Sequence, residues 1–194
     1  MARRWGILGI LGAVALSLAL AGCTVQGADG ESGSGTNMPA DPTQTLQVGD
    51  GGTSLCADSA GGGERTFGTP ITNTGDSALT LTGTVVDTTM NATLIGTAVL
   101  PADGDDAVNT TWSADYPPVL GDDLPEWSTH VPVAGYVLDP GSSAWVAWVI
   151  GLDDESTAGS IGGLRVTYRD GDADLTSDVA VVQFGIAPAH DCGF

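Results

Sequence analysis

Apolar side chains recur at every second position in several stretches of this chain. In residues 164–169, Leu164, Val166 and Tyr168 alternate with polar residues, and the sequence Asp-Gly-Asp separates them from an apolar run at 179–186. A period of two is the signature of a half-buried strand, and a glycine between two acids favours a turn. The two runs therefore predict a β-hairpin.

The same pattern predicts a fold that consists of strands throughout. The expected strand after Pro140 and Gly141 is apolar on both faces, which indicates a strand buried on both sides; its apolar residues are Trp145, Val146, Trp148, Val149 and Ile150. No stretch has a convincing helical period. Further strands are expected at 45–48, 65–72, 78–86, 92–100 and 131–138. We therefore predict an all-β fold, an antiparallel immunoglobulin-like β-sandwich of about eight strands, as one domain over 44–194.

The first 43 residues have a different composition. Arg3 and Arg4 precede an apolar run from Ile7 to Ala21, which is shorter than the roughly 20 residues of a membrane-spanning helix. A basic head, a short apolar run and small residues at its end are typical of a secretory signal peptide, here 1–22. The alternative is an uncleaved membrane anchor. The following residues are mostly Gly, Ser, Pro and acids, which predicts a flexible tether without a core.

The sequence Leu-Ala-Gly-Cys at the end of the apolar run resembles the lipobox of bacterial lipoproteins. This resemblance implies that Cys23 is lipidated on sulfur and becomes the first mature residue, so that 23–43 is a lipidated cysteine followed by a disordered linker. Acyl chains of this kind hold a protein stably on a bilayer. We therefore expect a lipid-anchored protein on the outer face of the bacterial cell membrane.

Three segments carry a second resemblance. The sequences FGTPITNTGDSALTLTGTVVD, LDPGSSAWVAWVIGL and GGLRVTYRDGD, in this order, resemble the sandwich domain of uncharacterised exported lipoproteins from high-GC Gram-positive bacteria, and more distantly immunoglobulin-like surface domains. The shared features are turns and core positions. The resemblance therefore bears on the fold and assigns no functional residue.

The charge of the chain limits its partners. The sequence has 24 acidic residues, five arginines and no lysine, and its formal charge is −19. Cleavage after residue 22 removes Arg3 and Arg4 and leaves three arginines, so the mature charge becomes −21. A surface of this sign repels phosphate groups and favours cations or basic partners. Nucleic acid is therefore not an expected partner.

Two cysteines remain once Cys23 is lipidated. Cys56 lies near the start of the domain and Cys192 near its end, and an even pair in an exported chain predicts a disulfide. The alternative is a zinc site that uses both cysteines together with His130 and His190. Local zinc-binding spacing is absent from the sequence, which favours the disulfide.

Catalytic motifs are also absent. The chain has no GxSxG elbow, no phosphate-binding glycine loop and no HExxH sequence, which favours a non-catalytic domain without a cofactor. The alternative is a calcium- or metal-dependent envelope hydrolase that uses the acidic loops. Asp170, Asp172 and Asp174 have the spacing that opens an EF-hand, but Leu175 and Val181 stand where that motif needs Gly and Glu. A hairpin turn already explains this segment.

The longest connection between expected strands is residues 101–130. Connections of this length are uncommon in compact domains and are often functional. It carries Trp112, Tyr116 and Trp127, whose rings are typical of recognition surfaces. We take these three residues as the candidate binding surface for an envelope protein or a glycan. The alternative is that the rings cap an open end of the sandwich.

Overall fold

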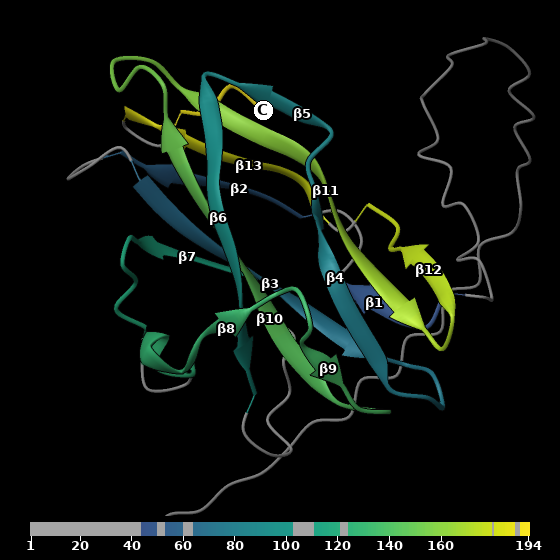
Figure 1. Cartoon of the computed structure of the whole chain (residues 1–194). Coiled ribbons are helices and arrows are strands. Elements are labelled where there is room, and N and C mark those ends of the chain that lie inside the picture. The colour runs from purple at the N-terminus through teal and green to yellow at the C-terminus, as the bar shows by residue number, and fades with distance from the viewer. Residues whose placement is uncertain are drawn as a thin grey trace, which may run out of the picture. The chain divides into compact units, whose positions relative to one another are not determined.

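The computed structural model describes residues 44–49, 53–59, 64–102, 111–120, 124–179, 181–188 and 191–194. Within them the chain forms two β-sheets that pack face to face, together with one 3-10 turn, η1 (Trp127–Thr129) (Figure 1). No helix among these residues has the length and hydropathy needed to cross a membrane. The predicted signal peptide, the predicted linker with Cys23, and His190 lie outside the described residues.

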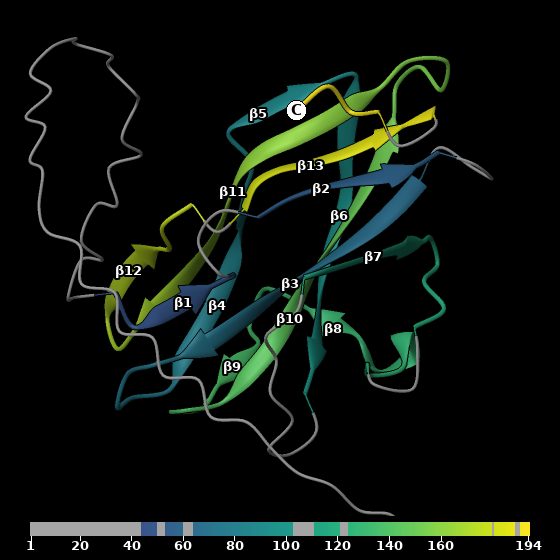
Figure 2. The same ribbon diagram turned by 180° about the vertical axis from the view of Figure 1, so that it is seen from behind.

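The first sheet has the order β1-β3-β10-β6-β8, and β7 also pairs with β3. All of its pairings are antiparallel. Strands β1 and β7 lie along one edge of β3, at opposite ends, while β10 occupies its other edge (Figure 2). The strands are β1 (Leu46–Val48), β3 (Glu64–Asn73), β6 (Ala92–Pro101), β7 (Trp112–Asp115), β8 (Val131–Pro132) and β10 (Ser143–Leu152).

The second sheet has the order β2-β13-β11-β4-β9, and β11 also pairs with β12 and β5. Strand β11 is the long central element, and two strands share each of its edges. The strands are β2 (Thr53–Asp58), β4 (Leu79–Val85), β5 (Thr88–Met90), β9 (Val137–Leu138), β11 (Gly159–Asp170), β12 (Ala173–Thr176) and β13 (Val181–Ala187).

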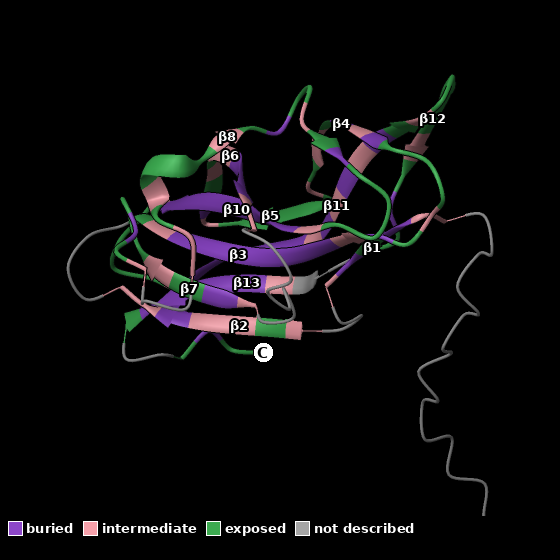
Figure 3. Ribbon diagram, turned by 90° about the horizontal axis from the view of Figure 1, so that it is seen from below, coloured by how far each residue is buried: buried purple, intermediate pink, exposed green. Residues whose placement is uncertain are grey.

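The main core lies between the two sheets. Phe67 of β3 stacks on Phe184 of β13 with ring centroids 4.5 Å apart, so the two sheets meet through aromatic side chains. Figure 3 shows that β3 and β10 are buried along most of their length. The predicted alternation is visible in β11, where Leu164, Val166 and Tyr168 are all fully buried. The predicted all-β sandwich class is confirmed.

The structure corrects the predicted strand count and pairing. The described residues contain thirteen strands, not about eight, because several short strands of two to four residues extend the edges of the sheets. The sandwich is not purely antiparallel, since β13 and β2 pair in parallel. The predicted strand at 131–138 is two strands in different sheets. Gly135, with φ +88°, turns the chain from β8 in the first sheet to β9 in the second.

The predicted hairpin is present with a divided second arm. Strand β12 pairs with the end of β11 across the turn at Gly171, and β13 pairs with the beginning of β11. Between β12 and β13, the buried side chain of Ser177 accepts a hydrogen bond of 3.0 Å from the Val166 amide. The hydroxyl thus takes the place of a main-chain ladder partner where the two strands separate.

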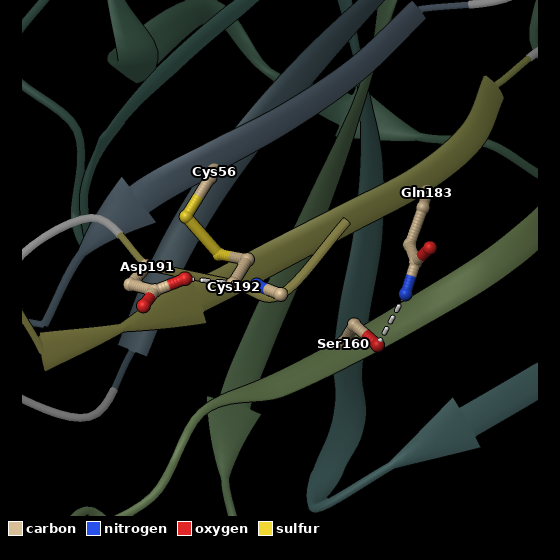
Figure 4. Close-up of a disulfide and its surroundings, with 6 residues drawn as sticks. Cys56, Ser160, Gln183, Asp191 and Cys192 are labelled. Carbon is tan, nitrogen blue, oxygen red and sulfur yellow. Dashed lines mark hydrogen bonds between the residues drawn. A yellow bond between two sulfur atoms is a disulfide. The ribbon is translucent and has the colours of Figure 1, made fainter.

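A disulfide joins Cys56 of β2 to Cys192 of the C-terminal segment, with Cα atoms 5.8 Å apart (Figure 4). It links positions 136 residues apart in the sequence and spans β13, whose Gly185 lies beside the sulfur of Cys192. The cysteine count predicted this bond. Since both thiols are used, the alternative zinc site at these cysteines is wrong.

Candidate binding surface

A second apolar cluster lies on the outer face of the first sheet. Because side chains alternate along β10, Trp145 and Ala147 point to this outer face while Val146 and Trp148 enter the main core. Residues of the connection after β6 cover the outer face, so β10 is buried on both sides. The cluster consists of Leu100, Trp112, Trp145 and Ala147, with Ala102, Ala114, Leu120, Leu124 and Trp127 packed against it.

Trp112 anchors the connection to the sheet. It lies in β7 directly opposite Gly68 of β3, and a Cβ atom at Gly68 would collide with its indole ring. The ring therefore lies flat over the glycine, and Trp112 is only 9% exposed. The prediction that Trp112 is part of the exposed surface is wrong, because an outer face of alanine, leucine and tryptophan offers the ring a dry packing site.

An ion pair fastens the other end of β7. The guanidinium of Arg65, on β3, pairs with the carboxylate of Asp115, and the Arg65 side chain is 13% exposed. The two residues also face each other in the strand register. Charge pairing and strand pairing thus fix the residue that precedes Tyr116.

Three rings form a continuous row beside this anchor. Tyr116, 42% exposed, meets Trp127 edge to face, with centroids 6.2 Å apart and planes at 84°. The imidazole of His130 stacks on the Trp127 indole at 4.5 Å and 16°. We call Tyr116, Trp127 and His130 the aromatic row.

The stacking of His130 on Trp127 follows from the local backbone. Residues three apart eclipse one another in a 3-10 turn, so the side chain that follows η1 lies over the first residue of the turn. The His130 amide and Nδ1 both donate to the carbonyl of Trp127, at 3.1 and 2.7 Å. Thr129 Oγ1 donates to the Glu126 carbonyl at 2.8 Å. These bonds hold the two rings in place.

The sequence did not identify His130 as a partner of the two rings. From the sequence, this histidine is one residue of a loop and an alternative zinc ligand. The available signal was its spacing of three from Trp127, but that spacing has meaning only once the turn is known to be 3-10.

Glu126, an exposed residue, directly precedes Trp127 in the chain. Its Oε2 accepts a hydrogen bond of 3.1 Å from Ser128 Oγ. The carboxylate of Asp115 pairs with an arginine, whereas that of Glu126 accepts a hydrogen bond from a hydroxyl group. The residue that precedes Trp127 thus carries an exposed carboxylate that is not paired with an arginine.

The acids predicted as calcium ligands already interact with neighbouring side chains. Asp170 accepts hydrogen bonds from Ser77 Oγ at 2.6 Å and Thr45 Oγ1 at 3.3 Å. Asp174 accepts from Nε and Nη2 of Arg169 at 3.1 and 3.0 Å, while Asp172 is exposed in the turn. In the described parts of the chain, no three His, Cys, Asp or Glu side chains are grouped to hold a metal ion. Calcium binding stays an untested prediction.

The acidic loop after β10 is also internally bonded. Ser156 donates to Asp154 through its hydroxyl at 2.7 Å and its amide at 2.9 Å, and these bonds hold the pKa of that carboxyl below its usual value. Asn91, whose φ is +46°, donates through Nδ2 to the carbonyl of Asp154 at 2.9 Å and to Thr157 Oγ1 at 2.7 Å. The hydrogen bonds of Asp154 thus stabilise the conformation of this loop.

Comparison with known proteins gives distant fold likenesses. No protein-family model and no curated protein sequence matches this chain. The PapD-like domain 7 of human CEP192 is 10% identical with a TM-score of 0.38, over 84% of this chain and 98% of that domain. The VesB protease of Vibrio cholerae is 11% identical with a TM-score of 0.36, over 75% of this chain and 32% of the protease.

A family 123 glycoside hydrolase from Clostridium perfringens is 8% identical with a TM-score of 0.32, over 71% of this chain and 23% of the hydrolase. This chain therefore spans about a third or less of the two enzymes. Likenesses this weak assign no residue and no activity to this chain. The chain is thus a two-sheet β-sandwich whose exposed aromatic row is its candidate binding surface.

Proposed function

We propose that this chain is an exported lipoprotein, anchored through Cys23 to the outer face of the bacterial membrane, whose β-sandwich is a non-catalytic binding domain. The observation that carries the binding role is the aromatic row. Its rings are held by the second apolar cluster and by η1, and Tyr116 is still 42% exposed.

The difference in exposure among the rings supports a binding role over simple capping of the sandwich. Trp112 and Trp145 cover the sheet, at 9% and 4% exposure, and they account for the burial of the outer face. Tyr116 is not needed for that burial. Fixed aromatic rings with an apolar body and a polar tip lose little conformational entropy on binding, which is why they are frequent at recognition sites.

The non-catalytic part of the proposal is supported by the described acids. Asp170, Asp174 and Asp154 accept hydrogen bonds from hydroxyl or guanidinium groups of the same domain. These hydrogen bonds give each of the three carboxylates a structural role in a turn or loop, which accounts for their presence without a catalytic role.

The anchor is tested by Cys23→Ser in the full chain, with Thr24→Ser as the matched control. We expect wild type and control to fractionate with membranes and to yield an N-terminal peptide whose mass includes acyl chains. The Cys23→Ser protein should appear in the soluble fraction without that mass. Membrane retention of Cys23→Ser, or an unmodified cysteine in wild type, would contradict the anchor.

The binding role is tested with a photoreactive amino acid at position 116. The matched control carries it at Met90, which is 56% exposed on β5 of the other sheet. We expect a defined adduct with envelope material from position 116 only, and binding of the same purified partner by the domain alone. Equal adducts from both positions, or undiminished binding of the purified partner by Tyr116→Ala, would contradict the role of the row.

A further inference from the structure

We infer that the aromatic row binds a cationic group, the lysine or arginine side chain of a basic protein partner. This inference rests on the proposed binding function and names its ligand class. It combines the charge state of the domain with the geometry of the three rings.

The positive charges of the domain are already paired. Arg65 pairs with Asp115, Arg165 with Asp87 at 2.6 Å, and Arg169 with Asp174 at 3.0 Å. These are all the arginines of 44–194, and the chain has no lysine, so most of its 24 acids have no basic side chain available to pair with. The long-range field of such a domain attracts basic partners and raises their rate of association.

The connection that carries the row is acidic in sequence. The connection at 101–130 has seven acidic residues and neither lysine nor arginine. Of the two acids in its described part, Asp115 is paired with Arg65, whereas Glu126, which directly precedes Trp127 in the chain, is exposed and accepts a hydrogen bond from Ser128. The carboxylate of the residue next to Trp127 is therefore not paired with an arginine and is available to a cation bound at the row.

The rings themselves fit a cation. The faces of tyrosine and tryptophan carry negative electrostatic potential, and lysine or arginine groups within about 6 Å of a ring centroid are attracted to them. Tyr116 and Trp127 stand nearly perpendicular, at 84°, so together they form a corner and not a flat surface. A compact ammonium group or the edge of a guanidinium can contact both rings of such a corner.

The same geometry is less suited to a sugar. Pyranose rings stack on a broad, uncovered aromatic face. Here Tyr116 and Trp127 stand at 84° to each other, so the two rings do not form one flat platform, and His130 covers one face of Trp127. Neutral glycans would also gain nothing from the negative field. The observations therefore favour a basic peptide, and glycan binding becomes an outcome of the test.

The test uses the soluble domain 44–194 with hexalysine as the probe, and hexaglutamine and chitohexaose as neutral probes. The readout is the indole NH signal of Trp127 in two-dimensional NMR spectra, assigned with Trp127→Phe. We expect hexalysine to shift this signal saturably, and salt to weaken the binding. Neither neutral probe should shift it.

Matched variants separate ring contacts from general charge attraction. Tyr116→Ala should weaken hexalysine binding about fivefold, while Tyr116→Phe, which keeps the ring, should stay within about twofold of wild type. Glu126→Gln should weaken it more than Glu155→Gln, which removes the same charge from an exposed loop elsewhere. Amide signals of β3 and β10 serve as the check that each variant is folded.

Three results would overturn the inference. The first is unsaturable, diffuse shifts with hexalysine, or equal binding by Tyr116→Ala. The second is a Trp127 response to chitohexaose alone, which would keep the row as a binding surface and assign it to glycans. The third is no response to any probe, and in that case the crosslinking at position 116 decides separately whether the proposed binding function survives.

Discussion

Replacing Asn73 tests how the sandwich closes at one end. This residue ends β3 and is fully buried. Its Nδ2 donates to the carbonyl of Ser77 at 2.8 Å and to that of Leu138 at 2.9 Å, and its Oδ1 accepts from the Gly75 amide at 2.9 Å. One side chain thus joins the end of β3 and the turn that follows it to β9 of the second sheet.

The expected cost follows from these three bonds. A side-chain hydrogen bond contributes about 1 kcal/mol net, and a buried group that loses its partner costs at least as much. Asn73→Ala removes three bonds and leaves the Leu138 carbonyl without its amide donor. We therefore expect it to lower the free energy of unfolding by about 3 kcal/mol.

The assay is urea unfolding of the soluble domain, followed by tryptophan fluorescence. Thr69→Val is the matched control, because Thr69 lies on the same strand, is fully buried, and its hydroxyl has no hydrogen-bond partner within the described structure. Its stability should change by less than about 1 kcal/mol and in the favourable direction. A loss below about 1 kcal/mol for Asn73→Ala, or an equal loss for Thr69→Val, would show that these three hydrogen bonds do not stabilise this end of the sandwich.

Three further predictions concern the disulfide, the second cluster and the acidic loop. Cys56→Ala opens a loop of 136 residues, so the free energy of unfolding should fall by up to about 5 kcal/mol in the same urea assay. An unchanged midpoint of urea unfolding would show that the disulfide adds no stability. Gly68→Ala should displace the Trp112 ring, cost about 1 to 3 kcal/mol and increase quenching of tryptophan fluorescence by acrylamide, and normal stability would contradict the packing of the ring. The Asp154 carboxyl should titrate below its unfolded pKa in NMR spectra, so its contribution to stability is present above that unfolded pKa and is lost as pH falls through the folded value. Ser156→Ala removes the hydroxyl donor and keeps the amide donor, so it should move the pKa part of the way towards normal, and an unmoved pKa would show that the hydroxyl hydrogen bond is not a cause of the shift.

The strands that could be predicted are those whose burial follows a simple period. Alternation in residues 79–85 and 164–169 requires only that one face of a sheet is buried. The run at 143–150 was also informative, because a strand apolar on both faces needs cover on both. The period of two does not show what covers the second face of this strand. That cover comes from the connection after β6, and it depends on contacts between residues that are distant in sequence.

The missed elements are short and flanked by irregular sequence. Strand β2 lies between glycine-rich segments, and its parallel partner β13 is over a hundred residues away, so no local pattern could pair them. For the candidate site, amphipathic rings predicted a surface but not which rings would be exposed. Trp112 is buried because Gly68 leaves room for its indole, and no sequence pattern links those two positions.

The described residues of the connection after β6 pack onto the first sheet and thereby hold the aromatic row in place. Amide hydrogen exchange of β7 (Trp112–Asp115) tests this directly, because its pairing with β3 requires protected amides. We predict that the β7 amides bonded to β3 exchange far more slowly than those of an unstructured peptide of the same sequence. Exchange of the β7 amides at the rate of the unstructured peptide, while β3 and β10 remain protected, would contradict the packing of this connection onto the sheet.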